Sequence, residues 1–378
     1  MEYKKLGDIA TYINGYPFKP EDRGECGLPI IRIQDLTGNT YDLGYYDGKY
    51  PERIEINNGD ILISWSASLG VYVWNRGKAL LNQHIFKVVF DKVEINKRYF
   101  VYAVQFKLKE MEAKAHGATM KHIVKKDFDS TLIPYPSLKE QSRIAETIDS
   151  IAKSINMRQK QLQKLDDLIK ARFVELFGLP GTNTFGWELV PLGSVCQINP
   201  KKSQDSRLRS GVGVSFVPMP AVTERGEIDA TAVKEYDEVK TGFTYFAEND
   251  VLFAKITPCM ENGKGAIAKC LHNGIGFGST EFHVLRPING KTNPYWIYTL
   301  TAFSQFRVDA ASNMTGSAGQ RRVPASFLEN YQVSLPPLPL QEQFATFVEQ
   351  TDKSKAVIQK ALDEAQLLFD SLMQKYFG

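Results

Sequence analysis

Two stretches of the chain carry apolar residues at the alternating spacing of three and four that is typical of long amphipathic helices. The first, residues 139–178, contains no Pro, and no Gly before Gly178. Its apolar positions follow at intervals of 4, 3, 4, then 7 across Arg158, then 3, 4, 4 and 3. This heptad seam predicts one long helix that buries a single stripe against a partner. The seam consists of Ile144, Ile148, Ile151, Ile155, Leu162, Leu165, Ile169, Phe173 and Leu176.

The second stretch, residues 341–378, has a poorer seam that is small and polar in its middle. Such a seam lets a helix with bulky Ile and Leu come close, so we expect the two helices to pair. Residues 139–178 carry 8 basic and 6 acidic groups, whereas residues 341–378 carry 4 basic and 6 acidic. These opposite net charges favour pairing with each other by a small, salt-screened margin. The predicted second seam is Phe344, Phe347, Thr351, Ser354, Ile358, Ala361, Ala365, Leu368 and Leu372.

Short β-branched and aromatic runs, punctuated by Gly, Asn and Asp, fill residues 1–138 and 179–340, which predicts two mixed α/β domains. The economical arrangement is an α+β protein with antiparallel helices, one domain at each end and an internal pseudo-twofold axis. A helix of about 39 residues is roughly 58 Å long, so the pair is expected to act as a spacer. The alternative, that each helix packs only on its own domain, stays open.

The two halves repeat one order of motifs. Leu6-Gly7 is echoed by Leu192-Gly193, and the strand-like residues 58–63 by residues 248–253. Residues 96–102 match residues 293–298, and Gly117 to Phe128 has the length of Gly316 to Phe327, with Val124 opposite Val323. A Pro-rich strand then precedes Glu140-Gln141 in one half and Glu342-Gln343 in the other, and both halves end on Phe-Gly. The preserved order indicates an internal repeat.

Composition and charge add limits. A chain of 378 residues with 43% hydrophobic residues suits two domains of ordinary size. A formal net charge of +3 neither demands nor excludes nucleic acid. Cys26, Cys196, Cys259 and Cys270 form no C-x-x-C, so free thiols are expected. No signal-peptide core and no membrane-spanning run is visible, which predicts a soluble, cytoplasmic protein without membrane contact.

Motifs for chemistry are missing. Gly290-Lys291-Thr292 has Leu285 where a phosphate-binding loop needs glycine, and Pro336-Pro337 lacks the flanking residues of an amino-methyltransferase motif. The two Glu-x-Lys triplets, at Glu112 and Glu238, are expected by chance. The five histidines show no metal-ligand spacing. We therefore expect no catalytic residue, no cofactor and no metal site.

Two glycine-led loops have the composition that DNA reading needs, because base edges require polar donors and phosphates require Lys or Arg. They occupy the same place in both halves but carry different residues, as expected for readers of different half-sites. The first loop offers Thr119, Lys121, His122, Lys125 and Lys126; the second offers Ser317, Gln320, Arg321 and Arg322.

The segments that follow the predicted central strands form a second candidate set. Trp65 is a candidate for base stacking, although a core role is the stronger expectation for it. For each charged residue, a solvated surface position is the alternative. The candidates of this set are Ser64, Trp65 and Ser66 in the first half, Lys255, Thr257 and Lys264 in the second, and the basic run Lys201, Lys202, Arg207 and Arg209.

Two variable halves, each closing with a Pro-rich strand, a Glu-Gln pair and a long helix, resemble the DNA-specificity subunit of type I restriction-modification systems. The resemblance covers essentially the whole chain through the motifs given above. It implies two target-recognition domains that bind double-stranded DNA, and spacer helices that bind two methyltransferase subunits. It also implies a restriction subunit with translocase activity as a further partner. The second half has Asn249 where the first has Gly59, which leaves the turn geometry there open.

Two other functions stay open at this point. One is a coiled-coil scaffold that does not touch DNA. The other is a self-sufficient DNA methyltransferase or nuclease, which would need a cofactor or metal motif that the sequence does not display.

Overall fold

The computed structural model describes residues 2–38, 42–114, 123–317 and 319–378. The chain forms two compact units. Unit 1 consists of residues 1–159 and 360–378, and unit 2 consists of residues 160–359. Each long helix therefore contributes one half to each unit.

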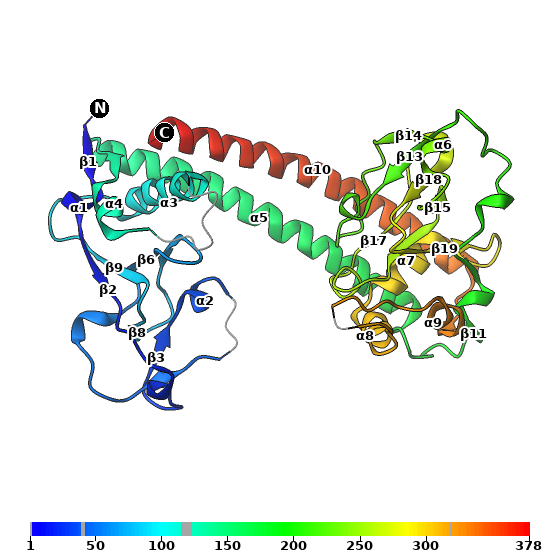
Figure 1. The fold of residues 1–378 in the computed structure, drawn as a ribbon, viewed down its shortest axis with the longest axis horizontal. Helices are drawn as coiled ribbons and strands as arrows, with labels where there is room; N and C mark the ends of the chain where they lie inside the picture. Colours follow the sequence, from blue (N-terminus) through cyan, green and yellow to red (C-terminus); the bar gives the residue numbers. More distant parts are fainter. Residues whose placement is uncertain (1, 39–41, 115–122, 318) are drawn as a thin grey trace. The chain divides into compact units, whose positions relative to one another are not determined.

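Unit 1 is a mixed α/β body (Figure 1). Its strands are β1 (Tyr3–Lys5), β2 (Thr11–Asn14), β3 (Leu28–Ile31), β4 (Tyr45–Tyr46), β5 (Glu55–Ile56), β6 (Ile61–Ser64), β7 (Gly70–Val73), β8 (Ala79–Leu81), β9 (Ile85–Val89) and β10 (Leu132–Pro134). Its helices are α1 (Leu6–Ile9), α2 (Ile33–Leu36), α3 (Lys97–Lys114), α4 (Lys125–Ser130), the first part of α5 (Leu138–Phe177) and the last part of α10 (Leu338–Phe377). The sheets have the orders β2-β9-β6-β7, β4-β3-β8-β5 and β1-β10, and only β3 and β8 run parallel among these pairs.

Unit 2 is built from the same parts. Its strands are β11 (Leu189–Pro191), β12 (Cys196–Ile198), β13 (Gly213–Val217), β14 (Val233–Glu235), β15 (Thr244–Ala247), β16 (Val251–Ala254), β17 (Gly265–Ile267), β18 (Ile275–Gly278), β19 (Phe282–Pro287) and β20 (Gln332–Ser334). Its other helices are α6 (Tyr236–Val239), α7 (Pro294–Ala302), α8 (Ser304–Ser312) and α9 (Ala325–Asn330). The sheets have the orders β12-β19-β16-β17, β14-β13-β18-β15 and β11-β20.

The sheet orders of unit 2 reproduce those of unit 1 strand for strand. Again one pair is parallel, β13 with β18, where β3 pairs with β8 in unit 1. Helices α7 and α9 stand in the places of α3 and α4, and α10 starts 200 residues after α5 with the same length of 40 residues. The internal repeat predicted from the order of motifs is therefore present in the fold.

The main core of unit 1 joins the first sheet to α3, to the start of α5 and to the end of α10. Tyr99, Phe100, Ile148 and Phe377 are fully buried in it. In unit 2 the corresponding core contains the end of α5 and the start of α10. Because apolar burial is the dominant favourable contribution to folding, each domain depends on residues from both long helices.

The two helices run antiparallel within each unit. In unit 2, Phe173 and Phe177 of α5 lie 5.5 and 5.4 Å from Phe344 of α10, measured between ring centroids. Further along, Lys355 Nζ lies 2.8 Å from Asp166 Oδ1. Residue numbers thus rise on α10 as they fall on α5, as the sequence predicted.

The predicted seam of α10 is buried at Phe344 and Thr351, but it is wrong in its middle and near its C-terminal end. Leu368 is 50% exposed and Ser354 is exposed, whereas Met373 and Phe377 are buried. The reason is that the last turns of α10 do not only face α5. They dock on the core of unit 1, so the buried stripe there follows Phe369, Met373 and Phe377 at intervals of four.

The strand motif Asn-Gly-Asp or Glu-Asn-Asp forms the same turn in both units. Gly59 has φ +90° and Asn249 has φ +68°, so both occupy the left-handed region that Gly and Asn tolerate best. The next residue, Asp60 or Asp250, accepts the backbone N–H of the residue three positions before it, at 2.8 and 2.7 Å. The change from Gly to Asn therefore leaves the turn unchanged. The basic residues that pair with these two carboxylates are Lys87 and Arg286.

A fully buried glutamine at or beside the Glu-Gln pair ties each long helix to its domain. Gln141 Oε1 accepts the backbone N–H of Asn96 at 2.9 Å, and its Nε2 donates to the carbonyl of Pro136 at 2.9 Å. The matching residues in unit 2 are Gln341, Asn293 and Pro336. The repeat partner of Gln141 is thus Gln341, 200 residues on, and the sequence match to Gln343 is corrected by two residues.

In the part of the chain that the structure describes, no helix combines the length and apolar character needed to cross a membrane. Among the same residues, no group of three or more His, Cys, Asp or Glu side chains could hold a metal ion.

Candidate nucleic-acid interface

The two candidate segments of the second half lie side by side in unit 2. The backbone N–H of Thr257, just after β16, donates to the carbonyl of Arg321 at 3.0 Å. The N–H of Val323 donates to the carbonyl of Lys255 at 2.9 Å, and Ile256 forms a β-bridge with Arg322. The glycine-led loop is therefore fixed to the strand exit by backbone hydrogen bonds, and two sets predicted separately form one surface.

Two arginines of this surface are paired with carboxylates. Arg322 donates from Nε and Nη2 to both oxygens of Glu281, at 2.8 to 3.2 Å. Arg321 Nη2 lies 3.1 Å from Glu261 Oε1. The hydrogen bonds from Arg322 lower the pKa of the Glu281 carboxyl, and the same contact raises the pKa of Arg322. Both groups therefore stay charged at neutral pH.

A buried histidine anchors the end of the loop. His283 Nε2 lies 2.8 Å from the carbonyl of Val323, and Nδ1 lies 3.0 Å from the side-chain amide of Asn199. A carbonyl only accepts, so Nε2 carries the proton and Nδ1 accepts from the amide. Burial lowers the pKa of His283, which keeps the ring neutral in this arrangement.

Unit 1 has the same backbone frame with different side chains. The N–H of Trp65, just after β6, donates to the carbonyl of His84 at 3.3 Å, as Lys255 does to Glu281 in unit 2. The N–H of Ile123 donates to the carbonyl of Trp65 at 3.0 Å. Trp65 and His84 thus stand where Lys255 and Glu281 stand in unit 2.

This frame corrects the sequence match of the two loops by one residue. Ile123 is buried like Val323, and its N–H makes the equivalent hydrogen bond. Val124 is 53% exposed and precedes α4 as Pro324 precedes α9. The earlier pairing of Val124 with Val323 was wrong because two adjacent β-branched residues gave no sign of which one points inward.

A family model described as the type I restriction modification DNA specificity domain matches residues 1–167 and 185–366. The chain belongs to this family. The resemblance predicted from the paired motifs is thereby confirmed, and with it the expectation of a specificity component. Relatives of the chain are named specificity subunits of type I restriction enzymes.

Two Escherichia coli relatives show how far the likeness extends. The specificity subunit of the type I restriction enzyme EcoEI is 39% identical over 194 residues, which are 50% of this chain and 32% of that protein. The EcoAI specificity subunit is 35% identical over 236 residues, 61% of this chain and 38% of that protein. The matched residues thus span about a third of the length of these relatives.

Two solved structures share the fold of this chain. A type I S subunit from M. genitalium matches with a TM-score of 0.57 and 16% identity, covering 100% of this chain and 96% of that one. A chain from a study of complex assembly and conformational transition of the type I R-M system matches with a TM-score of 0.52 and 17% identity, covering 100% and 97%. The predicted fold class, two mixed α/β domains with two long helices, is confirmed.

Ser64, a predicted DNA contact, has no exposed hydroxyl. The residue is fully buried at the end of β6, and its Oγ donates to the carbonyl of Ser68 at 2.5 Å. The expectation that it contacts DNA is therefore not supported. Trp65 is half-buried: its ring stacks on Phe86 at 5.5 Å, and its Nε1 lies 3.3 Å from Asn14 Oδ1. This is a packing role at the edge of the core.

The remaining basic candidates are scattered. Lys125 begins α4 and pairs with Asp129 at 2.6 Å, and Lys126 beside it is exposed. Lys201 and Lys202 are exposed, and the Lys202 amine donates to a backbone carbonyl. Lys264 is half-buried, with its amine 3.5 Å from the carbonyl of Met219. Gln320 is exposed and its carbonyl accepts from Arg322. Predicted residues that lie outside the described part are Thr119, Lys121 and His122.

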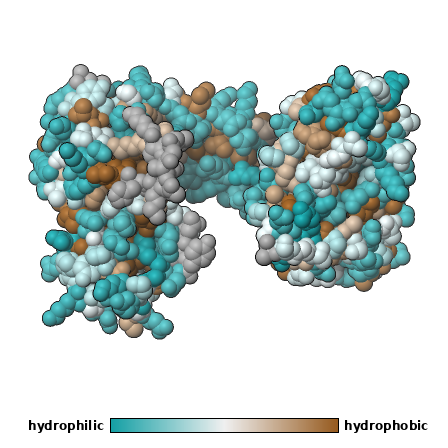
Figure 2. All heavy atoms as spheres, in the orientation of Figure 1, coloured by the Kyte–Doolittle hydropathy of each residue, from teal (hydrophilic) through white to brown (hydrophobic). Residues whose placement is uncertain are grey.

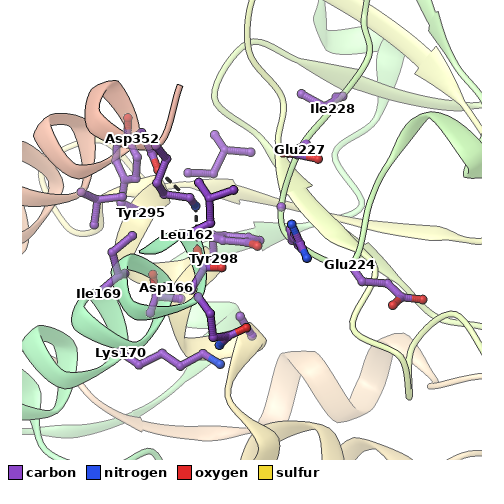
Figure 3. A pocket seen from close by; sticks show the side chains of 18 of the residues that line it. Leu162, Asp166, Ile169, Lys170, Glu224, Glu227, Ile228, Tyr295, Tyr298 and Asp352 are labelled. Atoms are coloured by element: carbon purple, nitrogen blue, oxygen red, sulfur yellow. Dashed lines mark ion pairs between the residues drawn. The ribbon is translucent and has the colours of Figure 1, made fainter. Parts of the chain in front are cut away.

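Unit 2 also contains a cavity of about 620 Å³, lined by α5, α7, α10 and residues 224–228 (Figure 3). Opposite charges pair on its wall: Lys355 Nζ of α10 lies 2.8 Å from Asp166 of α5, and 3.6 Å from Asp352 of α10 itself. Burial raises the pKa of Tyr298, on its wall, to about 12. The Lys355–Asp166 pair joins α10 to α5, so we interpret the cavity as part of helix packing and assign it no ligand.

Sequence reasoning missed Glu281, Glu261 and His283, which contact the candidate residues in the structure. Glu281 is 41 residues from Arg322, so no local spacing relates them. In the structure Glu281 directly precedes β19 as His84 directly precedes β9, and no strand was predicted from the sequence at either place.

Proposed function

We propose that this chain is the DNA-reading subunit of a type I restriction-modification complex. Each domain reads one half of a bipartite, asymmetric target in double-stranded DNA. The two long helices set the spacing of the half-sites and bind two methyltransferase subunits, and a restriction and translocase subunit joins them. The chain needs no cofactor of its own, and it acts in the cytoplasm, where the DNA is.

One observation carries the proposal. Both units hold a strand exit and a loop end in the same backbone frame, but the side chains on that frame differ: Trp65 and His84 in unit 1, Lys255 and Glu281 in unit 2. A shared scaffold with different side chains is what two readers of different base sequences require, because base edges are distinguished by their donor and acceptor patterns.

The helices offer surface for protein partners. Apolar side chains stay exposed on both, and Figure 2 shows brown spheres among the teal ones along them. Exposed apolar groups on a helix favour burial against another protein. The most exposed of them are Met157 and Leu168 on α5, and Val357, Leu367 and Leu368 on α10.

DNA binding by the complex of this chain with its methyltransferase tests the proposal. Replacing Arg321 and Arg322 by Ala should weaken binding to the target, and a residue that reads a base should cost about 1–3 kcal/mol and relax one position. Replacing Lys125 and Lys126 by Ala should weaken all sequences alike and flatten the salt dependence.

Two outcomes would count against the proposal. If neither pair of substitutions changes binding or methylation, these loops lie outside the interface. If the complex binds random and target duplex equally well under all salt conditions, the chain is a scaffold and not a sequence reader.

A further inference from the structure

The Glu281–Arg322 pair fixes one edge of a guanidinium at the candidate surface. Nε and Nη2 of Arg322 donate to Glu281, so the planar group is held on one side by both carboxylate oxygens. Nη1 donates to the carbonyl of Gln320 at 3.1 Å. A guanidinium has five N–H donors in a rigid plane, and these contacts use three of them. One donor on each terminal nitrogen remains.

Both partners sit on fixed backbone. Arg322 lies between two β-bridges, to Ile256 and to Thr315. Glu281 receives the N–H of Lys255 on its carbonyl at 2.9 Å, and its own N–H donates to Ser279 Oγ at 3.2 Å. The Arg322 side chain is nevertheless 41% exposed, against 24% for Glu281. The backbone of both residues is thus fixed, whereas the outer edge of the Arg322 guanidinium remains open to solvent.

The chemistry of the pair favours a base over a phosphate. A carboxylate in direct contact with the guanidinium repels a phosphate, whereas it has no such effect on a neutral base edge. In the major groove guanine presents two neighbouring acceptors, O6 and N7, and a bidentate arginine is their commonest specific partner. Holding the arginine in advance also lowers the side-chain entropy lost on binding.

We propose that Arg322, held by Glu281 as a positioning residue, reads one guanine in the half-site recognised by the second domain. Unit 1 lacks this pair among its described residues, since His84 stands in the place of Glu281. This inference rests on the proposed function and adds to it the base, the reader and the group that orients the reader.

Methylome sequencing of cells that express the full chain with its methyltransferase supplies the first test. We expect a G·C pair in one half-site that becomes degenerate with Arg322→Lys and with Glu281→Gln, while the other letters and the gap stay the same. Glu329→Gln, the same substitution on an exposed residue of α9, is the matched control and should leave the motif unchanged.

A second test changes the DNA as well as the protein. Duplexes of the target with 7-deazaguanine at that position lack the N7 acceptor, and binding by the wild-type complex should fall by about 10-fold. The same duplex should cause no further loss with Arg322→Ala. The inference is wrong if neither half-site contains a G·C pair, or if the substituted duplex binds wild-type and variant complexes as the unmodified duplex does. The proposed function fails separately, if methylation shows no sequence motif at all.

Discussion

At the start of each long helix a fully buried glutamine amide joins the helix to the segment that precedes α3 or α7. Gln341 accepts the N–H of Asn293 and donates to the carbonyls of Lys291 and Pro336. Its neighbour Glu342 is exposed. Removing a buried amide leaves its hydrogen-bond partners unsatisfied, which costs more folding free energy than removing an exposed side chain. We therefore expect Gln341 to contribute more to stability than Glu342.

We expect Gln341→Ala to lower the free energy of unfolding by about 1–3 kcal/mol, because it leaves a buried N–H and two carbonyls without partners. Glu342→Ala is the control and should change it by no more than about 0.5 kcal/mol. Urea denaturation of the full chain measures both. Equal losses for the two variants would show that the amide has no special role.

Two contacts between single residues could not be predicted from the sequence. The Glu-Gln pair was visible as a repeat, but its register was not, because a helix start with several polar residues does not reveal which one points inward. Arg322 was a candidate from the sequence, but its pairing with Glu281 was not visible, since the two residues are brought together only when the segment before β19 and the loop meet after folding. The loops were found by composition, and their contacts required the structure.

Among the elements, the long helices were the most predictable, because forty residues of three-and-four spacing exceed any chance pattern. Which residues of α10 form its buried stripe was less predictable. An α-helix drifts by about 20° per heptad from a strict seven-residue repeat, and the ends of α10 contact a domain core instead of one helix. The buried residues there follow that core.

The corrected stripe gives a prediction for α10. Phe377→Ala should lower the free energy of unfolding by about 3–5 kcal/mol, because Phe377 is fully buried against Tyr99 and Phe106. Leu368→Ala, at a position of the predicted seam that is half-exposed, should change it by less than about 1 kcal/mol. Thermal unfolding of both variants decides between the predicted seam and the buried stripe of the structure. A larger loss of stability for Leu368→Ala than for Phe377→Ala would favour the predicted seam.

The spacer role of α5 is tested by its length. Four residues inserted within 153–165 add about 6 Å of helix, and seven add about 10 Å. We expect both half-sites to keep their letters while the gap between them grows by a base pair or two with four residues, and by about three with seven. Methylome sequencing reads this directly. Altered letters with an unchanged gap would refute the spacer role.

For the whole molecule, the strand-for-strand repeat predicts what half of the chain does. Phe173 and Phe177 of α5 hold the positions that Met373 and Phe377 hold in α10, 200 residues later. A fragment of residues 1–178 loses the end of α10 from the core of unit 1. A second copy can supply its own α5 in the same place, which gives a symmetric dimer.

Such a dimer carries two identical readers, so with the methyltransferase it should methylate an inverted repeat of the first half-site. It should also tolerate salt better than the native pairing, because the opposite net charges of the two helices are lost. Light scattering at micromolar concentration and methylome sequencing provide the readouts. A strictly monomeric fragment, or a non-palindromic site, would contradict the repeat as a functional unit.

The central claim is that one chain reads two different sequences at a fixed distance. Methylome sequencing of a host that lacks other methyltransferases, with the full chain and its methyltransferase expressed together, tests it most directly. We predict one motif with two unlike half-sites separated by a gap of unspecified bases, absent when the chain is omitted. A single continuous motif, or the same methylation without the chain, would contradict the account.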